Sequence, residues 1–405
     1  MSFMEKLLEG VEVEWKSLWQ VTTWDKRFNA IDNYKQPKII KYNYLLANEI
    51  KPLIVHGGSV KLLTTNISNV WTTEELAGDL VSEGEVVAIP WGGNVVVQYH
   101  KGKFLTSDNR IATSNDVNFL DNKFLYHYLL NKIELLSSFY RGSGIKHPSM
   151  SKVLDLEIPI PPINIQTEIV RILENFTELT AELTAELTAR KKQYNYYREQ
   201  LLSFEDGEVE WKPLGEISDI YDSLHQTPKY AENGLSMIRV TDIKGGYINL
   251  DETLKVNDEV FAAFTKKYIP KKHDLVMSRV GSYGNVGIIP SDNSACMGQN
   301  TVVIHPLINN KYLFHILVSN IGQSFIESNV DGGNQKTLSL KSIKAIPIPL
   351  VSEKHQARIA SILDKFDALT NSITEGLPRE IALRQQQYEY YRELLLSFPK
   401  AEVET

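Results

Sequence analysis

The sequence has a single cysteine, Cys296, among 405 residues. One thiol excludes an internal disulfide and a metal cluster held by several thiolates, and it fits a reducing compartment. The longest uncharged apolar run, residues 86–99, is shorter than the roughly 20 residues that a membrane helix needs. Charged residues at positions 5, 6 and 9 stand where a signal peptide would have its apolar core. We therefore expect a cytoplasmic protein that does not span a membrane.

The sequence also lacks the motifs on which common catalytic sites are built. It has no GxxxxGK[ST] phosphate loop, no HExxH or comparable pairing of its nine histidines, and no NPPY or DPPY motif of an adenine methyltransferase. The glycine-rich stretch 281–287 opens no predicted helix, as a dinucleotide-binding fingerprint would, so we predict a turn between strands. These absences predict a chain with no catalytic centre, no bound metal and no bound cofactor.

Excess positive charge is missing as well. The net charge is −7, whereas nonspecific nucleic-acid binding usually depends on a basic surface, so any basic face must be local. The content of 42% hydrophobic and 23% charged residues is that of a globular protein, which excludes disorder as the main state. At about 150 residues per domain, the length predicts two or three domains.

An internal repeat is the most informative feature that is present. The segment RKKQYNYYREQLLSF at 190–204 recurs as RQQQYEYYRELLLSF at 384–398, a displacement of 384 − 190 = 194. Three further pairs match: IPIP at 158–161 and 346–349, residues 169–180 and 359–370, and GVEVEWKSL at 10–18 with DGEVEWKPL at 206–214. The final AEVET begins the last phrase again. Repeats of this length predict two copies of one element.

Each copy predicts a long helix. Apolar residues step by 4 and 3 from Ile165 to Leu183, which is the spacing of a coiled-coil seam, and the tandem TAEL units at 180–187 add a stutter. In the second copy, the proline of Gly376-Leu377-Pro378 should kink or restart the helix. Forty residues would span about 60 Å, enough to hold two domains apart. Packing of each helix into a local core is the alternative.

Two inserts, roughly residues 13–150 and 209–340, lie between the repeated elements and show no convincing similarity to each other. Runs of β-branched and aromatic residues predict short strands in both. These runs are 86–89, 95–99, 237–240, 275–277, 286–289 and 301–304. One helix follows in each insert, at 123–140 and at 311–328, and then a polar loop with glycine.

The two polar loops offer side chains that can read DNA. Asn and Gln pair with adenine, Arg and Lys pair with guanine, and glycine lets the backbone approach the duplex. A solvated turn explains either loop alone, but equivalent placement in both copies favours recognition. The candidate DNA-binding residues are Arg141, Ser143, Lys146, His147, Lys229, Lys266, Lys267, Arg279, Asn334, Gln335 and Lys336. The lysine-rich run at 266–273 is either a phosphate-contacting patch or a solvated face.

The whole chain resembles the specificity (S) subunits of type I restriction-modification systems. The resemblance is carried by IPIPP...Q at 158–166, IPIPL...Q at 346–356, the two YxYYR helices and DLVMSRVGSYGNVGI at 274–288. The TAEL units and the segment GLPREIALRQQQYEYYRELLLSF resemble the IC subclass. The resemblance is weakest across residues 20–150.

The resemblance implies an α+β fold with two mixed α/β target-recognition domains, separated by two long antiparallel coiled-coil helices in a pseudo-twofold repeat. The expected segments are residues 1–155 and 206–345 for the domains, with 156–205 and 346–405 for the spacer helices and tail. Each domain would read one half of a bipartite asymmetric target in double-stranded DNA. The helices would set the spacer and dock two methyltransferase subunits.

The resemblance also implies that the subunit itself is not an enzyme. Its partners, two methyltransferase and two restriction subunits, would use S-adenosylmethionine, ATP and Mg²⁺ to methylate adenine and cleave DNA. Tyr194, Tyr197, Tyr388 and Tyr391 are the candidates for partner docking, although some of these tyrosines should pack between the helices. Two alternatives remain open: a coiled-coil scaffold without DNA binding, and a fused DNA methyltransferase.

Overall fold

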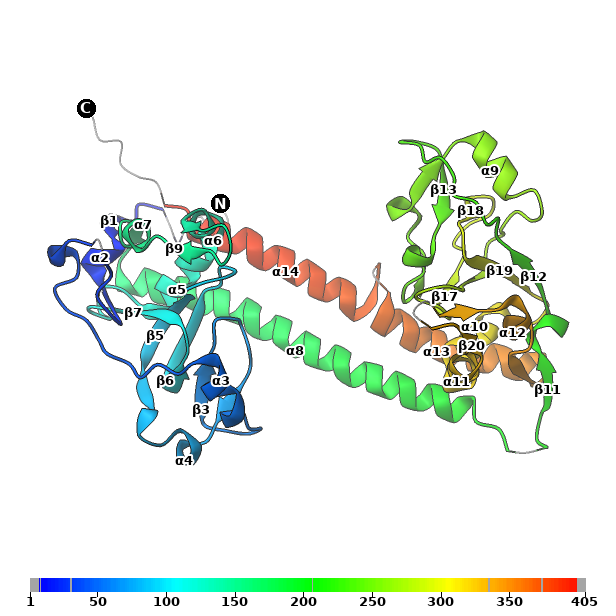
Figure 1. The fold of residues 1–405 in the computed structure, drawn as a ribbon, viewed down its shortest axis with the longest axis horizontal. Coiled ribbons are helices and arrows are strands. Elements are labelled where there is room, and N and C mark those ends of the chain that lie inside the picture. The colour runs from blue at the N-terminus through cyan, green and yellow to red at the C-terminus, as the bar shows by residue number, and fades with distance from the viewer. Residues whose placement is uncertain are drawn as a thin grey trace. The chain divides into compact units, whose positions relative to one another are not determined.

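The computed structural model describes residues 7, 9–29, 31–205, 207–333, 336–372 and 374–398. The chain divides into two compact units. Unit 1 is formed by Met1–Thr180 with Arg384–Thr405, and unit 2 by Ala181–Leu383. Each unit contains one insert and helical segments from both copies of the repeat, so the two units are mixed α/β structures, as predicted (Figure 1).

A six-stranded sheet forms the centre of unit 1. Its strand order is β2 (Thr22–Trp24), β7 (Asn109–Ser114), β5 (Ser82–Pro90), β6 (Gln98–Thr106), β3 (Val60–Leu63) and β4 (Trp71–Thr72). Successive residues of β5 alternate between two cores, with Val87 and Ile89 in one and Val86 and Ala88 in the other. Because both faces of β5 are buried from residue 86 to residue 90, this part of the strand is a continuous apolar run, VVAIP.

Unit 2 contains a five-stranded sheet and a three-stranded sheet. The first has the order β12 (Ser218–Asp222), β19 (Thr301–Pro306), β16 (Leu275–Ser278), β17 (Val286–Ile288) and β14 (Gly246–Tyr247). The second has the order β15 (Leu254–Val256), β13 (Leu235–Ile238) and β18 (Ala295–Met297). Cys296 is fully buried against Met237 and Val256, and burial raises the pKa of its thiol to about 12. Cys296 is therefore a packing residue of this sheet.

Helices follow the sheets at equivalent places. In unit 1 these are α5 (Asn122–Asn131) and α6 (Ile133–Ser138), and in unit 2 α10 (Asn310–Val318) and α11 (Asn320–Ser328). Each single helix predicted from sequence is therefore two helices. The second break has a clear local cause, because the Ser319 hydroxyl accepts the Ile321 N–H and caps α11. The predicted strand at 95–99 begins only at Gln98.

The two inserts, whose sequences show no convincing similarity to each other, contain a common arrangement of strands. Strands β2, β7 and β5 pair as β12, β19 and β16 do, with Val87 opposite Ala112 in one unit and Leu275 opposite Ile304 in the other. Helix α5 begins NKFLYHYL and α10 begins NKYLFHIL. The inserts share one framework whose surface residues have diverged.

In each unit, a strand before the insert pairs with a strand after it, and both strands belong to repeated motifs. Strand β1 (Glu14–Ser17) pairs antiparallel with β10 (Glu157–Ile160), and β11 (Glu210–Pro213) pairs antiparallel with β22 (Pro347–Leu350). The EVEW and IPIP motifs are repeated together because they form the two strands of one antiparallel pair. The short helices are α2 (Leu18–Val21), α3 (Ala47–Ile50), α4 (Glu74–Ala77), α7 (Met150–Leu154), α9 (Asp258–Phe264) and α12 (Leu340–Lys344).

The first long helix, α8 (Ile163–Leu201), runs through 39 residues without a break. The second is divided into α13 (Glu353–Asn371) and α14 (Gly376–Leu395), as the Gly376-Leu377-Pro378 sequence predicts. Gly376 has a φ of 75°, and a Cβ there would lie 2.4 Å from the Ala368 carbonyl oxygen. Glycine is therefore required at the break.

Aromatic contacts join these helices within each unit. The ring of Phe176 stacks on Tyr391 in unit 1, and the rings of Tyr194 and Tyr197 stack on Phe366 in unit 2. From Phe176 to Tyr194 the residue number on α8 rises, while that of the partner falls from Tyr391 on α14 to Phe366 on α13. The two long helical segments are therefore antiparallel, as predicted. In the described part of the chain, no helix has the length and apolar character needed to cross a membrane. The same spacing in the second copy predicts Ile359, Ile362, Phe366, Leu369 and Ile373 as seam residues, of which Ile373 lies outside the described residues.

Candidate nucleic-acid interface

Each polar loop of the sequence forms a short hairpin that precedes the IPIP strand. In unit 1 it joins β8 (Tyr140–Arg141) to β9 (His147–Pro148), and in unit 2 it joins β20 (Val330–Asp331) to β21 (Thr337–Leu338). Gly142 and Gly332 both have positive φ, at 147° and 107°. Since 332 − 142 = 190 and 337 − 147 = 190, the two hairpins have the same length and the same turn position.

Equivalent backbone hydrogen bonds anchor the two hairpins to the loop that follows a central strand. The Gly93 N–H donates to the Lys146 carbonyl oxygen at 3.0 Å, and the Gly281 N–H donates to that of Lys336 at 3.2 Å. Both lysine side chains are exposed. Lys146 and Lys336 therefore occupy equivalent positions, where an anchored backbone presents an exposed cation.

The hairpin of unit 1 carries four of the predicted residues. Arg141, Ser143, Lys146 and His147 are all exposed. The His147 Nδ1 lies 2.7 Å from the Trp91 carbonyl oxygen, and the two rings are 5.3 Å apart. Trp91 therefore orients His147, while the other three side chains extend from the same short turn.

The candidates of unit 2 are more dispersed. The Arg279 Nη1 lies 2.6 Å from Asp222 Oδ1, and its Nε donates to the Leu338 carbonyl oxygen, so this half-buried side chain holds the base of the hairpin. The Lys336 ammonium lies 5.9 Å from the Tyr283 ring centre. Asn334 and Gln335 lie outside the described residues.

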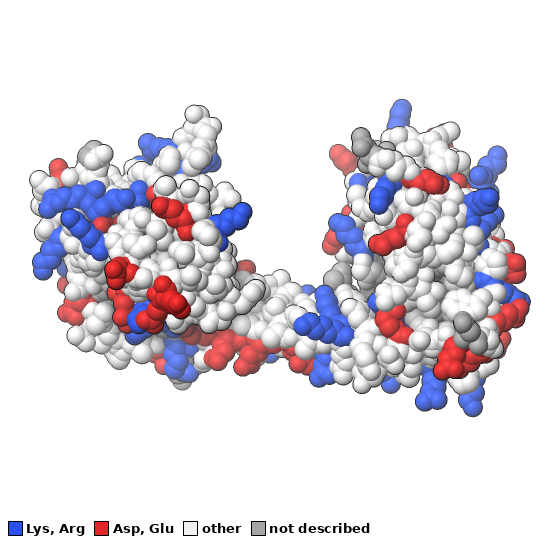
Figure 2. All heavy atoms as spheres, turned by 60° about the horizontal axis from the view of Figure 1, so that its bottom comes forward, with Lys and Arg blue, Asp and Glu red and all other residues white. Residues whose placement is uncertain are grey.

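The three other lysine candidates of unit 2 lie on separate segments. Lys229 is exposed between β12 and β13, and Lys266 with Lys267 is exposed just after α9. Figure 2 shows basic side chains gathered in a band across the upper part of the visible face of unit 1, with acidic side chains mostly below it, whereas basic and acidic side chains are interspersed on that of unit 2. Positive charge is therefore local, as the acidic net charge requires.

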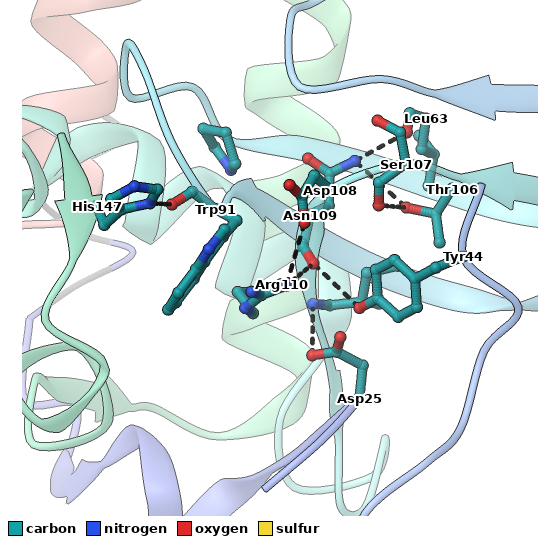
Figure 3. A network of polar contacts seen from close by, with 12 residues as sticks. Asp25, Tyr44, Leu63, Trp91, Thr106, Ser107, Asp108, Asn109, Arg110 and His147 are labelled. Atoms are coloured by element: carbon teal, nitrogen blue, oxygen red, sulfur yellow. Dashed lines mark hydrogen bonds and ion pairs between the residues drawn. The ribbon is translucent and has the colours of Figure 1, made fainter. Parts of the chain in front are cut away.

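Sequence reasoning missed a buried polar network behind the unit 1 hairpin (Figure 3). The Arg110 guanidinium lies 3.8 Å from the Trp91 ring centre, although this arginine is only 4% exposed. The Asp25 Oδ1 accepts the Ile111 N–H at 3.1 Å, and burial raises the pKa of Asp25 to about 6. The Tyr44 hydroxyl donates to the Asn109 carbonyl oxygen. Charged residues inside apolar strand sequences, TTWDKRF and NRIAT, were the available signal.

A second missed feature is a polar junction around a buried histidine, which occurs in both units. His127 and Lys123 of α5 contact Glu174 of α8, and His315 and Lys311 of α10 contact Asp364 of α13. The His127 Nε2, 3.4 Å from Glu174 Oε1, lowers the pKa of Glu174 to about 2, although burial acts in the opposite direction. Each junction fixes an insert on a long helix. The sequence signal was NKxLxH, which recurs at 311 − 123 = 188, the displacement of IPIP.

The tyrosine candidates have unequal surroundings. Tyr194 is 4% exposed with its hydroxyl 3.2 Å from His315 Nδ1, and Tyr388 is 9% exposed. Tyr197 and Tyr391 stack on the helix partners described above. The outward tyrosines are Tyr196 and Tyr390, which are 62% and 64% exposed and were not among the candidates.

Comparison with known proteins gives this arrangement a family. The sequence profile described as the type I restriction modification DNA specificity domain matches residues 28–190 and again 207–383. This chain belongs to the type I restriction-modification specificity subunits. The two matches correspond to the two repeated frameworks, so the fold and the recognition function predicted from the motifs are confirmed. The family is non-catalytic, in agreement with the prediction that this subunit is not an enzyme.

Two relatives and one solved structure illustrate the likeness. A type I restriction enzyme specificity subunit of Escherichia coli is 38% identical over 420 residues, covering 99% of this chain and 98% of the relative. A second from Escherichia coli is 31% identical over 410 residues, covering 93% and 92%. The crystal structure of the S subunit from M. genitalium matches with a TM-score of 0.63 and 17% identity over 99% of this chain and 100% of that one. That structure supports the fold of this specificity subunit.

Proposed function

We propose that unit 1 and unit 2 each read one half of a bipartite, asymmetric double-stranded DNA target. The observation that carries this proposal is the pair of equivalent hairpins, anchored by the same backbone hydrogen bonds. Arg141 begins the loop of one hairpin and Asp331 begins that of the other. Two hairpins with the same backbone but different side chains would contact different bases in the two half-sites, and the target would then be asymmetric. The long helices would set the number of unread base pairs between the halves.

The proposal includes two copies of a methyltransferase subunit and two of a restriction subunit in the cytoplasm. Because Tyr196 and Tyr390 stand at the same repeat position with nearly equal exposure, they suit two copies of one partner. The partners would use S-adenosylmethionine to methylate adenine, and ATP with Mg²⁺ to cleave DNA. This chain would supply only sequence recognition. Assignment to the IC subclass remains a prediction.

Methylation mapping tests the proposal directly. The chain is co-expressed with an IC-type methyltransferase subunit in cells that lack adenine methylation, and N6-methyladenine is mapped across the genome. We expect one split, asymmetric motif. A stable complex without new methylation would contradict the recognition role, and failure to form a complex would favour the scaffold alternative. Purified chain with labelled S-adenosylmethionine should transfer no methyl group, whereas a fused methyltransferase would.

The two hairpin lysines should act on separate halves of the target. We expect Lys146→Ala to change or weaken recognition of one half and Lys336→Ala that of the other, by about 1–3 kcal/mol if the lysine contacts a base. The methylated motif of each variant gives the result. Lys51→Ala, which removes an exposed lysine of unit 1 outside the hairpin, is the control. An identical effect of both hairpin variants on both halves would contradict the assignment.

The outward tyrosines should control assembly. We expect Tyr196→Ser or Tyr390→Ser to weaken binding of one methyltransferase copy by about 2 kcal/mol, as for an aromatic side chain at the centre of an interface. Native mass spectrometry of the complexes would then show an increased share with one methyltransferase subunit. Tyr34→Ser is the matched control because Tyr34 is also 62% exposed but lies in the insert. Equal loss in the control would exclude a specific docking role.

A further inference from the structure

A cavity of about 520 Å³ opens in unit 1 beside the reading hairpin. It lies between the loop after β5, the segment after β2 and the residues that follow His147, and its lining includes Lys26, Trp91, Arg110 and Pro148. Pro148 belongs to β9, the second strand of the hairpin. A group bound here would therefore lie next to whatever the hairpin contacts.

Arg110 provides a buried cation with an unused donor. It lies in β7 and is 4% exposed, its Nη1 donates to the Asn109 carbonyl oxygen at 2.7 Å, and its ring contact is with Trp91 (Figure 3). Among the described residues, the buried Nε has no hydrogen-bond partner. Burial of an arginine with an unsatisfied N–H is costly, and because Arg110 lines the cavity, an anion bound there would offset part of that cost through its charge.

Positive charge exceeds negative charge around the cavity. The cations are Lys26, Arg27 and Arg110, and the carboxyl groups near Arg110 are Asp25 and Asp108. Burial, and after it the charge of Arg110, lowers the pKa of Lys26. In the described chain, Asp25 Oδ2 is buried and has no hydrogen-bond partner, so this carboxyl group does not satisfy the Arg110 Nε. The Asp108 carboxylate is exposed, with its Oδ1 4.0 Å from Nη1.

Unit 2 shows that the shared framework does not require this charge. Arg110 stands opposite Ile89, and the residue at the equivalent register, opposite Met277, is Val302, which is fully buried. The β-strand framework thus accepts an ordinary apolar side chain at this place. An arginine here is a particular property of unit 1.

The two neighbouring positions also differ in charge between the units. The first residue after the central strand is Trp91 in unit 1 and Arg279 in unit 2, because Pro90 pairs with Asn109 as Ser278 pairs with Thr301. Trp24 pairs with Ala112 at the end of β2, as Ile220 pairs with Ile304 in unit 2, so Lys26 stands two residues further along, at the chain position that Asp222, opposite Val302, holds in unit 2. In unit 2, Arg279 and Asp222 form an ion pair at 2.6 Å. The same location is neutralised in unit 2 and cationic in unit 1.

We propose that the cavity binds a phosphate of the DNA backbone beside the half-site read by unit 1, with Arg110 and Lys26 as its cationic contacts. The inference rests on the proposed function. Phosphate oxygens fit the planar donors of a guanidinium group, and an anion compensates the surplus charge, which an uncharged base edge would not do. The contact fixes the position of the hairpin on the duplex and carries no base information.

Salt-dependent DNA binding tests the proposal in the complex with methyltransferase subunits, on a duplex that contains the mapped target. Arg110→Met and Lys26→Met remove charge while keeping side-chain length. We expect each to reduce the slope of log affinity against log salt by about 1, with the methylated motif unchanged. Lys51→Met, outside the cavity lining, is the control.

Neutral methylphosphonate linkages, introduced one at a time into the duplex, locate the phosphate. The wild-type complex should lose affinity at one linkage beside the unit 1 half-site, and Arg110→Met should abolish the loss at that linkage alone. Arg110→Lys should keep part of the effect. If Arg110→Met does not fold, Lys26→Met carries the same comparison.

Three results would overturn the proposal. A changed motif in Arg110→Met would make Arg110 a reader of bases. An unchanged slope and an unchanged linkage profile in folded variants would mean that the cavity holds only water. Absence of a specific target for the wild-type complex would remove the proposed function and the phosphate site together, whereas the first two results would leave the proposed function standing.

Discussion

Deletion of Thr184–Leu187 from α8 is expected to abolish methylation of the original target and to create a new target with the same two halves and a shorter spacer. Four helical residues correspond to about 6 Å and to about 40° of rotation beyond a whole turn. A base-pair step advances 3.4 Å and turns by roughly 34–36°. The rotation therefore matches one base pair and the translation approaches two. We expect the spacer to shorten by one or two base pairs.

The location of the TAEL tetrapeptides allows the deletion to change the length of α8 with little effect on packing. Both TAEL tetrapeptides lie within the unbroken helix α8, and residues 181–187 are exposed or half-buried. The deletion therefore removes length without removing a fully buried side chain. Substitution of the exposed Glu186 by alanine keeps the length and should keep the spacer. Methylation mapping of both variants decides the question, and an unchanged spacer after the deletion would refute the mechanical role of α8.

The long helices could be predicted from sequence because their signals are local. Heptad spacing, the TAEL repeat and the Gly376-Leu377-Pro378 break all act within a few residues. The distribution of tyrosines follows from the same geometry. Tyr194 and Tyr197 are three residues apart and share a helix face, whereas Tyr196 is offset by about 100° from Tyr197. Applied to the YxYYR motif, this period assigns Tyr196 and Tyr390 to the outer face.

The shared framework of the inserts could not be predicted in the same way. Strand pairing joins distant segments, and its register depends on buried faces that tolerate many apolar residues. The charged cavity illustrates the limit, since Lys26, Trp91 and Arg110 come from three separate segments. Within the inserts, the NKxLxH motif is the sequence similarity that indicates the common framework. Its two copies are 188 residues apart, the same displacement as the two IPIP motifs. The hairpin loops were found because glycine and polar residues mark turns locally.

The glutamine of each IPIP...Q motif should be the most sensitive polar residue of its unit. Gln166 is fully buried, and its Nε2 donates to the carbonyl oxygens of Phe119 and Pro161 at 2.8 Å each. Its Oε1 accepts the N–H of Asp121, the residue that caps α5. Gln356 accepts the Asn309 N–H and donates to the Val351 carbonyl oxygen. Each glutamine therefore joins the start of a long helix to the start of an insert helix.

Gln166→Leu keeps the approximate volume but leaves three backbone groups without their partner. At about 1–3 kcal/mol for each unsatisfied group, we expect a loss of about 3 kcal/mol or more in the free energy of unfolding of unit 1. For a unit of this size the midpoint of thermal unfolding should fall by about 6–12 °C. Gln356→Leu breaks two bonds, and unit 2 should lose about 2 kcal/mol.

Tryptophan fluorescence can separate the two effects, because unit 1 contains five of the six tryptophans and unit 2 only Trp211. Gln166→Leu should shift the denaturant midpoint seen by fluorescence, whereas Gln356→Leu should act mainly on the transition seen by circular dichroism. Gln385→Leu is the control, since Gln385 is exposed on α14 and bonds only to Glu389 among the described contacts, so its effect should stay within about 0.5 kcal/mol. If Gln166→Leu and Gln385→Leu lower stability equally, the buried glutamine does not hold the insert on its helix, and the recurrence of IPIP...Q would need another cause.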